Sequence, residues 1–165
     1  FRDIRNHLLL EVQRDTDFLT GANSRVAYIR DINVMGTHSS STGFIYADVN
    51  GLKQTNDTYG HSAGDILIKD AFALLLKHFS TEHDKIYRVG GDEFVIISVN
   101  ESKENFEARV NALTNDEHHE IISCGHTWLE VIHDTEWAVK EDEKEMYDEN
   151  ERFYSDHPEK DRRIH

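Results

Sequence analysis

Residues 85–99 are Lys-Ile-Tyr-Arg-Val-Gly-Gly-Asp-Glu-Phe-Val-Ile-Ile-Ser-Val, and this stretch decides the fold. Two runs rich in Ile, Val and aromatic residues, Lys85 to Val89 and Glu93 to Val99, flank Gly90-Gly91-Asp92. A Gly-Gly pair between two strand-like runs indicates a β-hairpin, because both central residues of a type I′ turn require positive φ. The stretch therefore predicts two antiparallel strands joined by a tight turn that carries carboxylates.

The segments around this hairpin add further strands and helices. The apolar run from Gly43 to Val49 is typical of a buried central strand, and the apolar residues from Ser62 to Phe79 recur at helical spacing. Other elements are expected as follows: a first helix of about four turns ending near Asp15, a helix capped by Ser102, a strand from Glu120 to Cys124 and a final helix from Trp137 to about Asp156. This order predicts one α/β (α+β) domain with a single central, mostly antiparallel β-sheet flanked by helices.

Composition excludes several classes of partner. The 165 residues include 32 acidic and 18 basic side chains, which gives a formal net charge of -14 and argues against nucleic acid or an anionic lipid surface as a direct partner. The single cysteine, Cys124, excludes an internal disulfide and fits a reducing compartment. No apolar run approaches the roughly 20 residues of a membrane span. We expect a cytoplasmic domain, or the cytoplasmic part of a membrane-anchored sensor.

The carboxylates of the predicted hairpin suggest a metal site. If the Gly43–Val49 strand pairs with the hairpin, then Asp48, Asp92 and Glu93 come close together, and such oxygen ligands suit Mg²⁺. Glycines at the turn would let a phosphate approach the backbone N–H groups. Spacing alone leaves a second interpretation open, in which these acids are ordinary solvated turn residues.

Five blocks of the sequence carry a resemblance to a known family. Gly90-Gly91-Asp92-Glu93-Phe94 is the signature of the GGDEF family, the diguanylate cyclase domains of bacteria. Four further blocks resemble family motifs in the same order: Asp17-Phe-Leu-Thr-Gly-Ala-Asn-Ser-Arg25, Asp48-Val-Asn-Gly-Leu-Lys53 with Asn56-Asp57 and Gly60-His61-Ser-Ala-Gly64-Asp65, Ile122-Ser-Cys-Gly125, and Met146-Tyr147. Ser24 stands where the family has Asn. The resemblance implies the ferredoxin-like, palm-type fold of the nucleotidyl cyclases.

The resemblance also implies a reaction. Two such domains would meet face to face as a homodimer, each holding one GTP, and condense the two nucleotides into cyclic di-GMP with release of pyrophosphate. Carried over by position, Asp48, the Val49 carbonyl and Asp92 would bind Mg²⁺ or Mn²⁺. Asp92, Glu93 and Lys53 would be catalytic: Asp92 as proton acceptor, Glu93 beside the metal, and Lys53 on the phosphates.

The resemblance implies a guanine site as well. Asn56 and Asp65 would accept and donate hydrogen bonds at the guanine edge, and adenine offers no matching pair of donors. His61, in the same loop, would lie on the substrate side. The remaining substrate-binding positions by resemblance are Gly51, Leu52, Gly90 and Gly91.

Two departures from the family pattern limit these expectations. The inhibitory product site of the family uses Arg-x-x-Asp, but here Thr81 replaces the Arg and only Asp84 is retained, so we expect no strong product inhibition. Many members carry basic residues after the Met-Tyr pair where this chain has Asn150 and Tyr154, so weaker triphosphate binding is expected.

Several alternatives remain open from the sequence. Residues 1–16 are expected to be a helical linker, the end of a signalling stalk below an upstream sensor, and residues 17–165 the GGDEF domain; the first helix could equally be a packed part of that domain. The chain starts with Phe-Arg-Asp, so we expect it to be part of a longer protein. Besides an active cyclase, the sequence allows a catalytically silent module that binds GTP and regulates a neighbour, or a dimerisation module.

Overall fold

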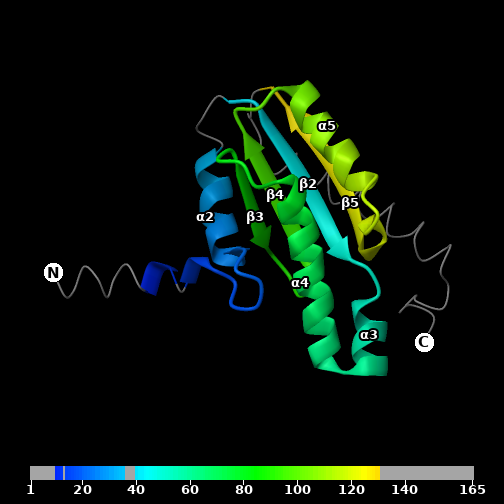
Figure 1. The fold of residues 1–165 in the computed structure, drawn as a ribbon. Helices are drawn as coiled ribbons and strands as arrows, with labels where there is room; N and C mark the ends of the chain where they lie inside the picture. The colour runs from blue at the N-terminus through cyan, green and yellow to red at the C-terminus, as the bar shows by residue number, and fades with distance from the viewer. Residues whose placement is uncertain (1–9, 13, 36–39, 131–165) are drawn as a thin grey trace.

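A five-stranded mixed β-sheet forms the centre of the computed structural model, which describes residues 10–12, 14–35 and 40–130 (Figure 1). The strands are β1 (Asn23–Ser24), β2 (Thr42–Val49), β3 (Asp84–Arg88), β4 (Glu93–Val99) and β5 (Ile122–Leu129), arranged in the order β1-β3-β4-β2-β5. Three neighbouring pairs are antiparallel, and β1 pairs with β3 in parallel. The predicted fold class is therefore confirmed.

The helices are α2 (Arg25–Met35), α3 (Leu52–Tyr59), α4 (His61–His78) and α5 (Lys103–Thr114), with a short 3₁₀ turn, η1 (His119–Ile121), before β5. Residues 10–12 and 14–15 are helical, in agreement with the predicted first helix. Ser102 caps α5 as expected, because its Oγ accepts a hydrogen bond from Asn105 N at 3.2 Å. Within the described ranges, no helix has the length and apolarity to span a bilayer.

Alternation along the strands divides the core between the two faces of the sheet. On one face, residues such as Ile45, Ala47 and Ile96 pack with α4 and α5, and on the other face Phe44, Tyr46 and Ile97 pack with Ala27 of α2. Figure 1 shows α4 and α5 side by side over the sheet, with the α3–α4 pair reaching beyond its end. This overhang lies beyond the end of β2, where Asp48 is found.

Two helices depart from the predicted element order. Neither α2 nor α3 was expected, and the reason is that neither has a broad apolar stripe: α2 buries only Ala27, and α3 buries no residue. The start of α2 is nevertheless marked by Ser24, whose Oγ accepts from Ala27 N at 3.2 Å as an N-cap. The last predicted strand is also shifted, because Glu120 belongs to η1 and the strand extends to Leu129. The predicted final helix lies outside the described residues.

Candidate functional site

The end of β2 and the start of β4 bring the backbone of the signature acids together. Asp48 and Glu93 are direct partners in the antiparallel register, and Val49 N donates to the Asp92 carbonyl oxygen at 2.8 Å. Asp48 is 8% exposed, whereas Asp92 and Glu93 are half-buried. The sequence-based expectation that these three residues meet at one end of the sheet therefore agrees with the strand register.

The hairpin that carries the signature is confirmed, but its predicted turn type is wrong. The positive φ angles of the described glycines occur at Gly21, Gly51 and Gly60, so Gly90 and Gly91 do not form a type I′ turn. The loop is closed by hydrogen bonds from the N–H groups of Val89 and Gly90 to the Glu93 carbonyl oxygen, at 2.9 and 3.3 Å. Gly90 is instead required by close approach, because a Cβ there would lie 2.1 Å from Glu93 Oε2.

The donor set at this end of the sheet fits a hard divalent cation. Asp48, Asp92 and the Val49 carbonyl supply oxygen ligands, and Mg²⁺ is commonly held by one or two carboxylates with the remaining positions taken by water and substrate phosphates. Within the described part of the chain, no group of three or more His, Cys, Asp or Glu side chains is placed so that it could hold a metal ion.

Arg88 connects the signature loop to the segment around Asp17 through hydrogen bonds. Its guanidinium donates to the Gly91 carbonyl oxygen at 2.7 Å and to both oxygens of Asp17 at 3.2 and 3.3 Å. Asp17 also accepts from the backbone N–H and the hydroxyl of Thr20, at 2.8 and 2.6 Å. Burial alone would raise the pKa of Asp17, but these bonds from Thr20 and the charge of Arg88 outweigh it and hold that pKa below its ordinary value.

Neither Asp17 nor Arg88 was predicted to have a role, although Asp17 belongs to a quoted motif. The available signal was a single cationic residue, Arg88, two positions before Gly90 at the end of an apolar strand. The parallel pairing of Ser24 with Arg88 explains how two segments so distant in sequence come into contact.

Asn50 is a structural residue and not a metal ligand in this arrangement. Its amide donates to the Glu120 carbonyl oxygen at 3.0 Å, and its Oδ1 accepts from the Ser123 hydroxyl at 2.9 Å. The backbone N–H of Asn50 donates to the Ile121 carbonyl oxygen at 2.8 Å. These bonds connect the end of β2 to η1 and β5. In the Asp48-Val49-Asn50 segment, Asp48 is therefore the residue whose side chain was predicted to bind the metal.

The α3–α4 pair presents the residues assigned to guanine. Asn56 lies on α3, and its Oδ1 packs so closely on Gly64 of α4 that a Cβ there would be 1.9 Å away. This Oδ1 is buried and has no hydrogen-bond partner among the described residues. Asp65, the next residue on α4, is exposed. The site thus combines a buried acceptor with a neighbouring free-standing carboxylate.

Most of the other predicted substrate residues lie at the start of the same two helices, whereas Gly90 and Gly91 lie in the loop between β3 and β4. Gly51, in a left-handed conformation with φ 70°, precedes α3, and Leu52 and Lys53 form its first turn. His61 was predicted to share a loop with Asn56, but it is the first residue of α4 while Asn56 lies within α3. Lys53 and His61 are both exposed.

Asp84, the retained residue of the inhibitory motif, is fully engaged inside the protein. Arg109 of α5 donates to both carboxylate oxygens of Asp84, at 2.6 and 2.9 Å. The Asp84 side chain is only 1% exposed. Ser98 and Thr81 donate further hydrogen bonds to it at 2.7 and 2.8 Å. Burial alone would raise the pKa of Asp84, but the bonds from Arg109 and Ser98 outweigh it and keep that pKa low.

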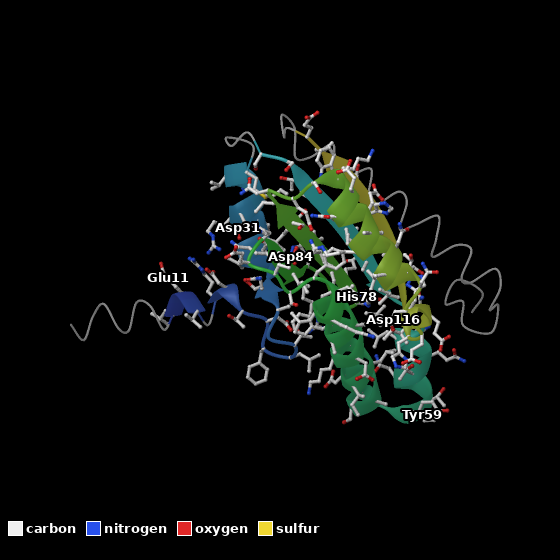
Figure 2. The ribbon with its side chains drawn as sticks, turned by 45° about the horizontal axis from the view of Figure 1, so that its top comes forward. Glu11, Asp31, Tyr59, His78, Asp84 and Asp116 are labelled. Atoms are coloured by element: carbon white, nitrogen blue, oxygen red, sulfur yellow. The ribbon has the colours of Figure 1, made fainter. Side chains whose placement is uncertain are left out.

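A second ion-pair cluster lies at the C-terminal end of α4. Asp116 accepts from Lys77 at 2.6 Å and from a ring nitrogen of His78 at 2.8 Å, and Figure 2 shows His78 and Asp116 side by side. The hydrogen bond from Lys77 is the main cause that lowers the pKa of Asp116 far below its ordinary value. This cluster joins α4 to the α5–β5 connection and contains none of the predicted site residues.

Four positions named from the sequence lie outside the described residues: Met146, Tyr147, Asn150 and Tyr154.

Comparison with known proteins identifies relatives of the chain. A family model described as "Diguanylate cyclase, GGDEF domain" matches residues 14–131. Over 107 residues, which are 63% of this chain and 16% of the relative, the sequence is 33% identical to the cyclic di-GMP phosphodiesterase PdeR of Escherichia coli K12. The chain therefore spans about a sixth of the length of that curated relative.

Two solved structures share the fold. The GGDEF domain of FimX from Pseudomonas aeruginosa matches with a TM-score of 0.72 and 16% identity, covering 84% of this chain and 94% of the FimX chain. The coiled coil and GGDEF domain of DgcB from Caulobacter crescentus, solved in complex with cyclic di-GMP, matches with a TM-score of 0.74 and 19% identity, covering 88% and 86%. At these identities the likeness establishes the fold and nothing further.

Proposed function

Because the chain belongs to the GGDEF domain family, we propose that it is a diguanylate cyclase module that condenses two GTP molecules into cyclic di-GMP and pyrophosphate across a homodimer. One observation carries the proposal: the β2–β4 register sets Asp48 opposite Glu93 and next to Asp92, at the end of the sheet from which α3 and α4 project. Carboxylates for a cation, a cationic side chain for phosphate and an amide for guanine are thus supplied by neighbouring elements.

In this proposal each copy binds and orients one GTP. The buried Oδ1 of Asn56 and the carboxylate of Asp65 accept hydrogen bonds from the N–H groups on the guanine edge, which adenine cannot supply in the same pattern. Lys53, in the first turn of α3, is assigned to the phosphates. Asp48, Asp92 and the Val49 carbonyl would hold Mg²⁺ or Mn²⁺, which supplies countercharge for the triphosphate when bound.

The bond changes balance between the two copies. The 3′-oxygen of each GTP forms a bond to the α-phosphorus of the other, the bond from that phosphorus to the bridging oxygen breaks, and pyrophosphate leaves with the electron pair. Asp92 is assigned to receive the hydroxyl proton. Since each copy holds one nucleotide, the signature loops of the two copies must face each other for the reaction to occur.

The test uses the 165-residue protein at high concentration, or fused to a dimeric coiled coil, with GTP and Mg²⁺. Formation of cyclic di-GMP and pyrophosphate is expected. Asp92→Asn should reduce turnover by about a hundredfold or more, because a ligand and proton acceptor are lost together, while circular dichroism stays unchanged. Asp70→Asn, an exposed acid of α4, is the matched control. Turnover of the Asp92→Asn protein at the parent rate would refute the site assignment.

A second candidate function is a silent module that binds GTP and regulates a neighbouring domain. Asn150 and Tyr154, which replace basic residues, favour it, and the matched relative PdeR is a phosphodiesterase of which this chain spans a small part. Binding of GTP without pyrophosphate release in the same assay would select this function. In either function, residues 1–16 are assigned to a helical linker that connects the domain with an upstream segment.

A further inference from the structure

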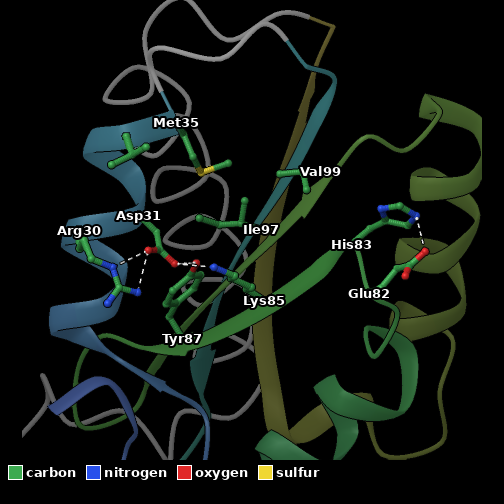
Figure 3. A pocket seen from close by; sticks show the side chains of 10 residues that line it. Arg30, Asp31, Met35, Glu82, His83, Lys85, Tyr87, Ile97 and Val99 are labelled. Atoms are coloured by element: carbon green, nitrogen blue, oxygen red, sulfur yellow. Dashed lines mark hydrogen bonds and ion pairs between the residues drawn. The ribbon is translucent and has the colours of Figure 1, made fainter. Parts of the chain in front are cut away.

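A cavity of about 290 Å³ lies between the C-terminal half of α2 and strands β3 and β4 (Figure 3). Its floor is apolar and is formed by Met35 of α2 together with Ile97 and Val99 of β4. Ile97 and Met35 belong to the apolar cluster that packs on the α2 face of the sheet, opposite α4 and α5. None of the residues assigned to GTP lines this cavity, so it is separate from the proposed nucleotide site.

One wall of the cavity is polar and is centred on Asp31. Its carboxylate accepts from Lys85 Nζ at 2.9 Å, from the Tyr87 hydroxyl at 2.8 Å and from the Arg30 guanidinium at 2.9 Å (Figure 3). Burial alone would raise the pKa of Asp31, but these three donors outweigh it and hold that pKa below its ordinary value. Asp31 is therefore ionised at neutral pH, and its accepting capacity is largely taken.

The polar capacity that remains for a ligand is donor capacity. The Lys85 side chain is 58% exposed, and its ammonium has three N–H groups, of which Asp31 takes one. On the opposite lip lie Glu82, whose side chain is 89% exposed, and His83, whose Nε2 is 3.8 Å from Glu82 Oε1. A ligand at this wall must therefore bring an acceptor, and a carboxylate adds a Coulombic attraction to the ammonium that a neutral acceptor lacks.

The size and lining of the cavity narrow the ligand further. Pockets for drug-sized ligands usually measure about 300–1,000 Å³, so this cavity is at the small end of that range and matches the body of a small molecule. We propose that this cavity binds a small monocarboxylic acid with an apolar body, such as an arylalkanoate, with the carboxylate on Lys85 and the body against Met35, Ile97 and Val99. The inference does not depend on the proposed nucleotidyl transfer.

The test is a methyl-labelled NMR titration of the 165-residue protein with 3-phenylpropanoate. Saturable shifts are expected for the methyl groups of Met35, Ile97 and Val99. The neutral analogue 3-phenylpropanol keeps the apolar body and lacks the charge, so it should bind at least fivefold more weakly. Lys85→Gln should weaken the acid by a similar factor and leave the affinity for the alcohol unchanged.

Two controls make the outcome decisive. Lys69→Gln removes an exposed lysine of α4 on the other face of the sheet and should not change either affinity. Val34→Trp, at a cavity-lining position that is 53% exposed, should block both probes without a cost to folding. Four results would each overturn the inference: shifts that do not saturate, equal binding of acid and alcohol, an unchanged affinity of Lys85→Gln for the acid, or saturation of the same methyl groups by cyclic di-GMP.

Discussion

The carboxylate of Glu93 lies directly over the Cα of Gly90, and this contact defines what position 90 can hold. A methyl group there would come within 2.1 Å of Glu93 Oε2, which is the end of a flexible side chain and can move away. Glycine is therefore needed at position 90 to leave space for the Glu93 carboxylate. The backbone conformation of Gly90 does not itself require a glycine.

A prediction at the residue scale follows for Gly90→Ala. The substitution should displace the Glu93 carboxylate while changing the free energy of unfolding little, and turnover should fall about tenfold to a hundredfold because the reacting groups are misplaced. The carboxyl ¹³C signal of Glu93 and the rate of cyclic di-GMP formation measure the two effects. For Gly91→Ala, where a Cβ meets nothing within 4 Å, the Glu93 signal should stay in place. An unmoved signal in Gly90→Ala would contradict the argument.

Asp84 gives a second prediction at this scale, on the dependence of stability on pH. The folded-state pKa of Asp84 lies below its ordinary value of 3.8, so its contribution is complete above that pH and is lost as the pH falls through the folded-state pKa. Asp84→Asn should lower the free energy of unfolding by about 1–3 kcal/mol at pH 7, because Arg109 loses the charge of its most buried partner and keeps only Glu101 as an anionic one.

Urea denaturation of the parent and the Asp84→Asn protein at pH 7 and pH 3 measures this difference. The gap between them should narrow at pH 3, because the Asp84 carboxyl of the unfolded chain takes up a proton below its ordinary pKa of 3.8 and this favours the unfolded state of the parent. Asp70→Asn serves as the exposed control with a small gap at both values. An equal gap for Asp84→Asn at the two values would show that the ion pair with Arg109 is not the cause.

At the scale of elements, β2 and α5 pack without room for a side chain between them. A Cβ on Gly43 would lie 2.2 Å from the ring of Phe106, which is fully buried and makes an edge contact with Phe79 at 6.2 Å. Gly43→Ala should therefore destabilise the fold by about 1–3 kcal/mol through overpacking. Urea denaturation measures the loss, and the double variant with Phe106→Leu should recover part of it. A loss that is the same in both backgrounds would mean that the ring is not the obstacle.

The elements that could be predicted from the sequence are those that bury a regular apolar face. β2, β3, β4, α4 and α5 have such faces. The observed bounds of the first four lie within one or two residues of the predicted ones, and α5 begins directly after its predicted cap, Ser102. α3 was missed because it follows Gly51 in a left-handed conformation, has no side-chain cap and buries no residue. Its position is determined by tertiary contact with α4 at Gly64, which local sequence patterns do not report.

For the candidate site, the sequence predicted which strands come together but not the long-range side-chain contacts. The register that sets Asp48 opposite Glu93 follows from pairing the predicted strands, and it is what the sequence indicated. The contacts of Arg88 with Asp17, and of Arg109 with Asp84, span 71 and 25 residues and depend on how distant elements pack. No periodicity or spacing rule specifies such pairs, so the sequence could name the acids but not their partners.

For the molecule as a whole, the formal charge of -14 bears on how two copies meet. The proposed reaction needs two domains face to face, and like charges oppose that encounter at low ionic strength. Turnover per molecule should therefore rise with protein concentration, and at a fixed low concentration it should rise as salt is increased to about 0.15 M.

Initial rates of cyclic di-GMP formation over a concentration series at two ionic strengths test this prediction. A fusion to a dimeric coiled coil should remove most of both dependences, since the second copy is then supplied at a high effective concentration. A rate per molecule that is independent of concentration in the unfused protein would argue for a stable dimer or a different reaction.

Asn50 has one more consequence, for how the protein ages. It is followed by Gly51, and Asn-Gly is the dipeptide in which the backbone nitrogen most readily attacks the side-chain amide to release ammonia. Here the amide is 7% exposed and is held at both its nitrogen and its oxygen by Glu120 and Ser123. The folded chain is thereby protected against slow deamidation beside its candidate active site, a protection that is lost whenever β2 and η1 separate.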